Sequence, residues 1–194
     1  MKAKSIGALL LSLCALPALA ADPVHPEFEK CVGRNWPTID DAEDRVRSCS
    51  RALQTLKLSP DQVADARLAR GVGRYVLGEA VIASDDYQEA LRHYDQAIDP
   101  GKPDALMLYR RGIAREGMGQ TEKALEDFAA AIKAAPQRTL AYLDRGVMLA
   151  TRLRAFERAI ADFDRVLQIE PDNVPALIAR GSAYGEIAQF GRAL

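Results

Sequence analysis

A spacing of about 34 residues between matching glycines is the feature that most constrains this 194-residue chain. Gly146 follows Gly112 by 34 residues, and Gly181 follows Gly146 by 35. Each interval accommodates two helices with small residues at fixed places, and a period of this length is typical of proteins built from stacked structural repeats. The spacing therefore predicts a row of similar helical hairpins.

The stretch from Ala105 to Pro136 shows the whole pattern when Ala105 is counted as position 1. Positions 8, 20 and 27 are small, because two antiparallel helices cross closely there and a larger side chain would hold the backbones apart. Proline at position 32 ends the second helix. The pattern consists of Gly112, Gly119, Ala124, Phe128, Ala131 and Pro136; it returns as Gly146, Phe156, Ala159, Phe163 and Pro171, and it begins again with Gly181, Tyr184, Phe190 and Ala193.

These residues at these spacings resemble the tetratricopeptide repeat (TPR), a two-helix unit of 34 residues. The resemblance implies an all-α fold: a right-handed superhelical solenoid of antiparallel helix hairpins, in which neighbouring repeats bury each other's apolar faces. We expect repeats at about 71–104, 105–138 and 139–173, and a truncated repeat at 174–194. The expected helices span 105–118, 121–134, 139–152, 156–169 and 174–188.

The fourth repeat is expected to be incomplete, with Phe190 and Ala193 at the start of its second helix. A solenoid needs a polar element over its last apolar face. Two interpretations stay open: the sequence is part of a longer repeat array, or a partner covers that face.

The first repeat is harder to place. Ser59-Pro60-Asp61 is a typical helix start, with a hydroxyl cap, a proline and an acid in the first turn. We expect one long helix over 61–83, in which Gly78 takes position 8 and the seven residues around Gly71 are an insertion. Its second helix is expected to carry Tyr87, Ala90, Tyr94 and Ala97.

Residues 1–20 have the features of a secretory signal peptide. Lys2 and Lys4 form a short positive start, an apolar run follows over 6–16, and Ala18-Leu19-Ala20 is a small-x-small cleavage site. Cleavage after Ala20 is expected, which predicts a periplasmic or secreted protein.

The apolar run is too short to be a permanent membrane span. Attachment of a lipid to Cys14 is the alternative outcome of processing, although that reaction favours a small preceding residue and Leu13 is large.

Export would leave Cys31 and Cys49 as the remaining cysteines, and an oxidising compartment favours a disulfide between them. The bond would pin an N-terminal helical hairpin at 21–58, whose second helix is expected over 41–53. The spacing of Ala42, Val46 and Cys49 matches that of Ala124, Phe128 and Ala131. The alternative is a thiol-redox or other enzyme that uses the two cysteines, but catalytic pairs usually have the closer C-x-x-C spacing.

Little in the chain indicates catalysis or a cofactor. His25 and His93 are the two histidines, and their spacing from the cysteines does not suit a zinc site. The formal net charge of −1 gives no basic excess for nucleic acid. We therefore expect no cofactor, no nucleic-acid partner and no enzymatic activity.

The TPR resemblance implies that the first helices of successive repeats line a concave groove, with positions 5 and 9 facing it. The expected groove residues are Tyr109, Ile113, Leu143, Val147, Ile178 and Ser182, with Glu116 and Asp144 nearby. Such a groove would suit an extended apolar peptide or an amphipathic helix. The function expected is a non-catalytic protein- or peptide-binding adaptor or scaffold, and the sequence does not predict its oligomeric state. The alternative is that these residues only pack between helices.

Arginine recurs at position 7 as Arg111, Arg145 and Arg180, where the family usually has leucine. A buried guanidinium needs a partner, and position 23 offers Asp127 and Asp162. We predict the pairs Arg111–Asp127 and Arg145–Asp162, with Arg180 lacking a same-repeat partner. The alternative is that the arginines extend to solvent over packed stems.

Overall fold

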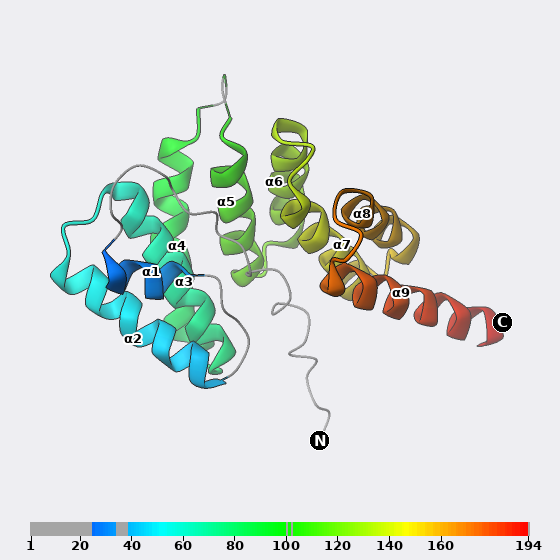
Figure 1. Cartoon of the computed structure of the whole chain (residues 1–194), viewed down its shortest axis with the longest axis horizontal. Helices are drawn as coiled ribbons and strands as arrows, with labels where there is room; N and C mark the ends of the chain where they lie inside the picture. Colours follow the sequence, from blue (N-terminus) through cyan, green and yellow to red (C-terminus); the bar gives the residue numbers. More distant parts are fainter. Residues whose placement is uncertain (1–24, 34–38, 100, 102, 194) are drawn as a thin grey trace.

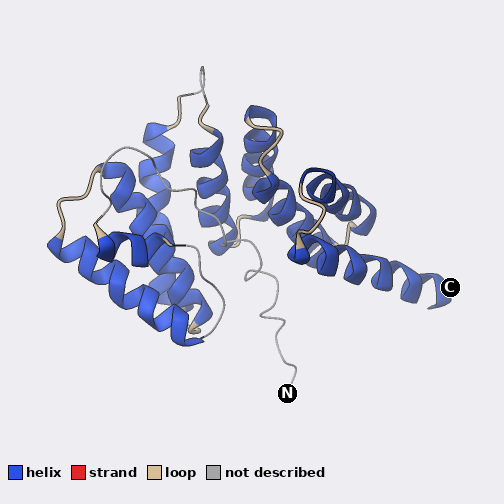
Figure 2. Cartoon of the chain, viewed as in Figure 1, coloured by secondary structure: helices blue, strands red, loops and turns tan. Residues whose placement is uncertain are grey.

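The computed structural model describes residues 25–33, 39–99, 101 and 103–193. These residues form helices joined by short turns, with no strand among them (Figure 2). The expected signal peptide lies outside the described residues. Of the helices that are described, none combines the length and apolar character needed to cross a bilayer. The helices are α1 (Pro26–Val32), α2 (Ile39–Thr55), α3 (Pro60–Val76), α4 (Ala80–Ala97), α5 (Ala105–Gly117), α6 (Thr121–Ala134), α7 (Thr139–Leu153), α8 (Phe156–Ile169) and α9 (Val174–Ala193).

Each helix packs against the next one in the sequence, and the hairpins follow one another in a curved row from α1–α2 to α9 (Figure 1). Contacts between α3 and α5, and between α7 and α9, join the first helices of neighbouring hairpins. The expected all-α solenoid of antiparallel hairpins is confirmed. The five helices expected from residue 105 onward begin where the structure places them.

Local sequence explains where several helices begin. Ser59 caps α3, because its side chain accepts a hydrogen bond from the Gln62 amide while the Gln62 side chain accepts one from the Ser59 amide. Asp104 caps α5 by accepting from the amides of Leu106 and Met107. The expected helix start at Ser59-Pro60-Asp61 is therefore confirmed.

The small residue at position 8 is the point where the two helices of a hairpin touch. A Cβ atom built on Gly112 would lie 2.6 Å from the Phe128 ring, and one built on Gly146 would lie 2.6 Å from the Phe163 ring. Gly71 has the same relation to the Tyr87 ring, at 3.0 Å. The 2.6 Å distances leave no room for a side chain, so glycine is required at Gly112 and Gly146 by the close approach of an aromatic ring, and the contact at Gly71 is tight.

The expected helix over 61–83 is wrong. The chain leaves α3 at Val76 and turns at Gly78, whose φ of 80° lies in the left-handed region that glycine adopts readily. Gly78 therefore matches the turn residue Gly119, with φ of 72°, and Gly71 takes position 8.

The extra seven residues of the first repeat consequently lie after the helix crossing. Helix α4 has 18 residues where α6 has 14, and the connection that follows is also longer. With this register Asp86 holds position 23. His93 lies 2.8 Å from Asp61, between its Nε2 and the Asp61 Oδ1.

The expected second helix at Phe190 is also wrong, because α9 continues as one helix from Val174 to Ala193. The position that matches the turn glycines Gly78 and Gly119 is Ala188.

The predicted arginine–aspartate pairs are confirmed, and each lies within one hairpin. Asp127 accepts from Nε and Nη2 of Arg111 at 3.0 and 2.7 Å. Asp162 accepts from the same two atoms of Arg145 at 2.9 and 2.7 Å. Each pair is bidentate, which fixes the geometry of the two helices as well as balancing the charge.

The corrected register adds a third buried arginine–aspartate pair; each of these three pairs is called a rung here. Asp86 is 1% exposed and accepts from Arg70 at 2.9 and 2.7 Å and from Arg74 at 2.7 Å. Arg180, for which no same-repeat partner was expected, pairs across repeats with Asp164 of the preceding helix α8 at 2.6 Å.

Removal of one carboxylate tests the contribution of these rungs. Asp127→Ala would leave the guanidinium groups of Arg111 and Arg115 without their buried partner. We expect a loss of roughly 3–5 kcal/mol in the free energy of unfolding, measured by urea denaturation. The control is Asp164→Ala, whose pair with Arg180 is 41% and 34% exposed and should contribute less than about 1 kcal/mol. Equal losses for the two variants would contradict a structural role for the buried rungs.

Candidate functional site

Four of the eight expected groove residues are core residues. Tyr109 and Ile113 are each 4% exposed, Leu143 is 3% exposed and Val147 is 6% exposed. They belong to the two apolar cores that run through the stacked hairpins. The expectation that these four line an open groove is therefore wrong, and the packing alternative holds for them. The reason is that long side chains such as Tyr109 fill the space between the first helices α5 and α7.

A hydrogen bond joins the two first helices. The Tyr109 hydroxyl donates to Oδ2 of Asp144 on α7 at 2.9 Å, and both groups are buried. Asp144 is thus a buried contact between repeats and offers little surface to a partner. Glu116, half-buried on α5, lies close enough for its negative charge to act on Asp144.

Burial sets the protonation of this carboxyl pair. Burial raises the pKa of Glu116 to about 7, and the nearby positive charge of Arg152 opposes that rise. Burial, and secondarily the negative charge of Glu116, raise the pKa of Asp144 well above its usual range, against the lowering effect of the Tyr109 hydrogen bond. Glu116 therefore titrates close to neutral pH.

The two cysteines form the expected disulfide between α1 and α2. Both residues are 0% exposed and pack in a small N-terminal core with Phe28, Ala52 and Ala66. A sulfur in that position has no access to an external thiol or disulfide, so the geometry suits a structural bond rather than a redox centre.

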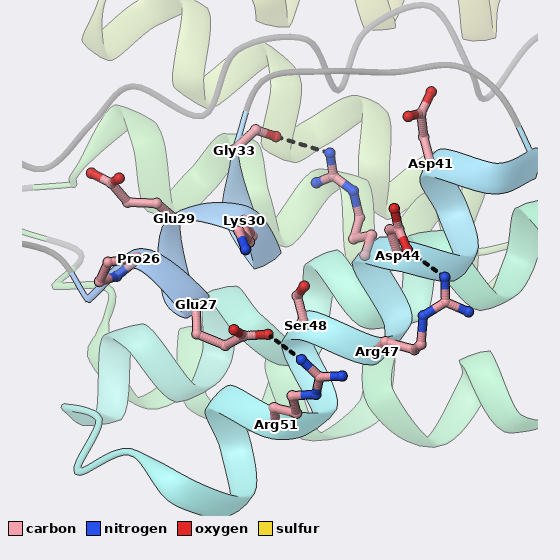
Figure 3. Close-up of a pocket in the computed structure, with 11 residues that line it drawn as sticks. Pro26, Glu27, Glu29, Lys30, Gly33, Asp41, Asp44, Arg47, Ser48 and Arg51 are labelled. Atoms are coloured by element: carbon pink, nitrogen blue, oxygen red, sulfur yellow. Dashed lines mark hydrogen bonds and ion pairs between the residues drawn. The ribbon is translucent and has the colours of Figure 1, made fainter.

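An open pocket of about 670 Å³ lies between α1 and α2 (Figure 3). Its charged groups pair with one another: Arg51 lies 3.7 Å from Glu27, and Arg47 forms an ion pair with Asp44. Arg45 donates to the Gly33 carbonyl at 2.9 Å and so holds the end of α1. Because acids and bases are matched within the pocket, it presents no excess of one charge to a ligand.

The other two expected groove residues, Ile178 and Ser182, are exposed on α9. Ile178 is 58% exposed, and the Ser182 hydroxyl donates to the Ile178 carbonyl at 3.0 Å. Three large apolar neighbours are also exposed: Val174 at 59%, Leu177 at 43% and Tyr184 at 53%.

These residues share one side of the helix, since positions three and four apart lie on the same face. Gly181 and Gly185 lie on that side as well, and a Cβ atom on either would have no described atom within 4 Å. The opposite side packs on α8 through Ala176 and Ala183, which are 0% and 2% exposed. The α9 face is defined here as Val174, Leu177, Ile178, Gly181, Tyr184 and Gly185.

Sequence reasoning identified Ile178 on this surface but missed the rest of the α9 face. The available signal was the repeat register itself. Leu177 and Tyr184 hold positions 4 and 11, which the second helix of a hairpin normally covers, and the structure shows no such helix beside α9 among the described residues.

The described residues contain no group of three His, Cys, Asp or Glu side chains placed to hold a metal ion. The groups available for binding are therefore the apolar side chains of the α9 face and the charged side chains around it.

The raised pKa of Glu116 predicts how stability depends on pH. The folded state holds this proton more tightly than the unfolded state, whose value is near 4.5, so the stabilisation is complete below pH 4.5 and is lost as pH rises through about 7. Glu116→Gln should remove a decline of up to about 3 kcal/mol in unfolding free energy between pH 5 and pH 8. Urea denaturation at both pH values measures this. Parallel behaviour of wild type and Glu116→Gln would contradict it, and the exposed Glu126→Gln is the control.

Comparison with known proteins agrees with this geometry. Residues 109–174 match the family model described as tetratricopeptide repeat. The chain is 32% identical over 95 residues to DnaJ homolog subfamily C member 3 of Rattus norvegicus, a match that covers 49% of this chain and 19% of the relative. It is 27% identical over 165 residues to the DnaJ homolog subfamily C member 7 homolog of Schizosaccharomyces pombe, covering 78% of this chain and 33% of the relative. The chain thus spans about a fifth to a third of the length of these curated relatives.

Solved structures share the fold. The first TPR domain of human RPAP3 superimposes with a TM-score of 0.50 at 22% identity, over 69% of this chain and 99% of that domain. A tetratricopeptide repeat protein from Parabacteroides merdae gives a TM-score of 0.50 at 20% identity, over 86% of this chain and 62% of the other. The matched residues 109–174 run from α5 to the start of α9, where the ring-on-glycine contacts and the arginine–aspartate rungs recur. Residues 109–174 therefore match the tetratricopeptide repeat, and the described residues are folded as an all-α solenoid of the kind seen in TPR structures.

Proposed function

We propose that this protein is a non-catalytic protein-binding scaffold that acts outside the cytoplasm and contacts its partner through the α9 face. The observation that carries the proposal is the exposure of four large apolar side chains on one side of one helix. Contiguous apolar surface of this kind is characteristic of protein interaction sites, because its contact with water is unfavourable.

The chemistry of the α9 face favours a polypeptide partner. Aliphatic and aromatic side chains dominate the surface, with the two glycines allowing close backbone approach. Apolar side chains on a partner helix or extended peptide would satisfy such a surface. Of the expected groove residues, Ile178 belongs to the α9 face and Ser182 lies beside it on the same helix, while the four buried ones are part of the packed cores.

Two observations support export. The sequence begins with the basic, apolar and small-residue segments that signal peptides require. Cys31 and Cys49 are joined in a disulfide, a bond that persists mainly in oxidising compartments. The bond would stabilise the N-terminal hairpin by about 3 kcal/mol on the chain-entropy model.

Export is tested by the N-terminus of the protein recovered from the periplasm or medium of an expressing bacterium. We expect mass spectrometry to find a chain that begins at Ala21, with no free thiol on Cys31 or Cys49. Retention of Met1, or a lipid on Cys14, would contradict the proposal. Replacement of Leu9 by arginine, which interrupts the apolar run, is the control and should leave the protein unprocessed.

Binding through the α9 face is tested by site-specific photocrosslinking in cells. A benzoyl-phenylalanine in place of Ile178 should give adducts with a polypeptide, whereas the same residue in place of the exposed Lys123 on α6 should give few. The substitution should leave the melting temperature unchanged, because Ile178 is 58% exposed. Equal adduct yields at the two positions, or none at Ile178, would place the binding surface elsewhere.

A further inference from the structure

We propose that Glu116 on α5, Asp144 on α7 and the Tyr87 hydroxyl on α4 form a binding site for a primary ammonium group, carried by a lysine side chain or by a free amine. The site shares no residue with the α9 face and is additional to the proposed function. A single charged group needs little exposed surface, and the half-buried Glu116 provides the side from which it can approach.

Asp144 differs from the other buried aspartates of this protein in lacking a base. It is 6% exposed, yet no arginine, lysine or histidine lies within ion-pair distance of it among the described residues. The Tyr109 hydroxyl donates to it, but a neutral donor does not balance a charge. Without a cation the carboxyl is pushed toward its neutral form, and burial raises its pKa well above the usual range. An arginine nitrogen lies within 3.0 Å of each of the other four, Asp65, Asp86, Asp127 and Asp162.

Glu116 is the second carboxyl of the site. Its negative charge acts on Asp144 across the boundary between α5 and α7. No residue in the described part of the chain donates a hydrogen bond to its carboxyl group or forms an ion pair with it, and the exposed Arg152 on α7 acts on it from beyond ion-pair distance. Each of the two carboxyls opposes ionisation of the other, and a cation bound to both would remove that repulsion.

The Tyr87 hydroxyl points independently to a ligand beside Glu116. Tyr87 is 1% exposed, and its hydroxyl has no hydrogen-bond partner among the residues that the structure describes. The ring carbon Cζ, which carries the hydroxyl, lies 2.5 Å from the Cβ position of Gly117, and Glu116 is the charged group that acts on the hydroxyl most strongly. Phe128 and Phe163 hold the equivalent position in the next two hairpins and carry no hydroxyl. Packing therefore needs the ring but not its oxygen.

A primary ammonium group suits this set of acceptors. It carries three N–H donors and no acceptor in a compact unit, and the site offers the oxygens of two carboxyls and one hydroxyl. A guanidinium is a wider planar fork, which suits the single carboxylates that the arginines of this chain already contact. A metal ion suits the site less well, because the described residues hold no group of three His, Cys, Asp or Glu side chains placed to bind one.

The charges around the site determine how binding depends on pH. Glu116 faces Arg152 and Asp144 of α7 and Tyr87 of α4, and Tyr75 of α3 acts on Tyr87 in turn. Burial raises the pKa of Glu116 to about 7, so its carboxyl is mostly protonated at pH 6 and mostly ionised at pH 8. A bound ammonium group favours the ionised form. Affinity should therefore rise about tenfold from pH 6 to pH 8, with release of about one proton per bound ammonium at pH 6.

The test is an NMR titration of the full chain with butylammonium chloride, followed at the carboxyl carbons of Glu116 and Asp144. We expect saturable shifts, with binding about tenfold tighter at pH 8 than at pH 6. Tetramethylammonium has the same charge but no N–H donor, and it should bind about tenfold or more weakly at equal ionic strength. Equal affinities for the two cations, or no saturable binding of butylammonium at pH 8, would overturn the inference.

Variants of the chain locate the bound group. Glu116→Gln should weaken butylammonium binding at pH 8 about tenfold or more, because a charge-assisted hydrogen bond is lost. Tyr87→Phe should weaken binding without lowering the melting temperature, since phenylalanine already holds this position in two hairpins. Arg152→Gln should tighten binding, because it removes a positive charge that acts on the site. The exposed Glu126→Gln on α6 is the matched control and should bind as wild type does. Wild-type affinity in Glu116→Gln or in Tyr87→Phe would overturn the inference.

Two comparisons identify the source of the ammonium group. Tighter binding of N-acetyl-lysine N-methylamide than of butylammonium would assign the site to a lysine of a polypeptide, and the reverse order would assign it to a free amine. The cationic residues outside the described side chains are Lys2, Lys4, Arg34, Lys102 and Arg192. Butylammonium binding that appears only after these residues are replaced by glutamine would give the site to a cation of the chain itself and would overturn the inference. Adducts at Ile178 should be the same in Glu116→Gln, so this site and the proposed function can fail separately.

Discussion

The contact between an aromatic ring and a glycine backbone is the constraint on which the hairpins of this protein depend. With the Phe128 ring 2.6 Å from the Cβ position of Gly112, the two helices lie as close as a side chain allows. That approach brings Arg111 within bidentate reach of Asp127, so the buried charge has a partner in the same hairpin. Packing and charge pairing thus depend on the same small residue, and both would fail if the helices moved apart.

Stacking of the hairpins adds a second, polar set of contacts between repeats. Asp65 on α3 accepts from Arg110 on α5 at 3.0 Å and from the Tyr94 hydroxyl at 3.0 Å. The Tyr109–Asp144 hydrogen bond joins α5 to α7 in a similar way. Buried polar groups are tolerated because they satisfy one another, and they fix the register of one repeat on the next. The residues that were expected to line an open groove are instead used in this packing.

Helix α9 carries the first-helix half of the hairpin pattern. When the side chains between the helices are all used in packing, only the side chains that remain exposed are available to bind a partner. The side chains left on the surface include the α9 face, where Gly181 and Arg180 repeat features that are covered in the hairpins α3–α4, α5–α6 and α7–α8. The proposed binding function therefore follows from the same interactions that build the fold.

The sequence by itself determined the repeat period, the starts of the helices from residue 105 onward, the Cys31–Cys49 disulfide and the rungs at Asp127 and Asp162, because these follow from local spacing and charge within one hairpin. Only the tertiary structure decided the register of the first repeat, since Gly71 and Gly78 differ in backbone conformation and neighbours, not in residue type. It also decided that Tyr109, Ile113, Leu143 and Val147 are buried while Ile178 is exposed. Equivalent positions in a repeat pattern have the same sequence character, and their exposure depends on whether a neighbouring helix covers them.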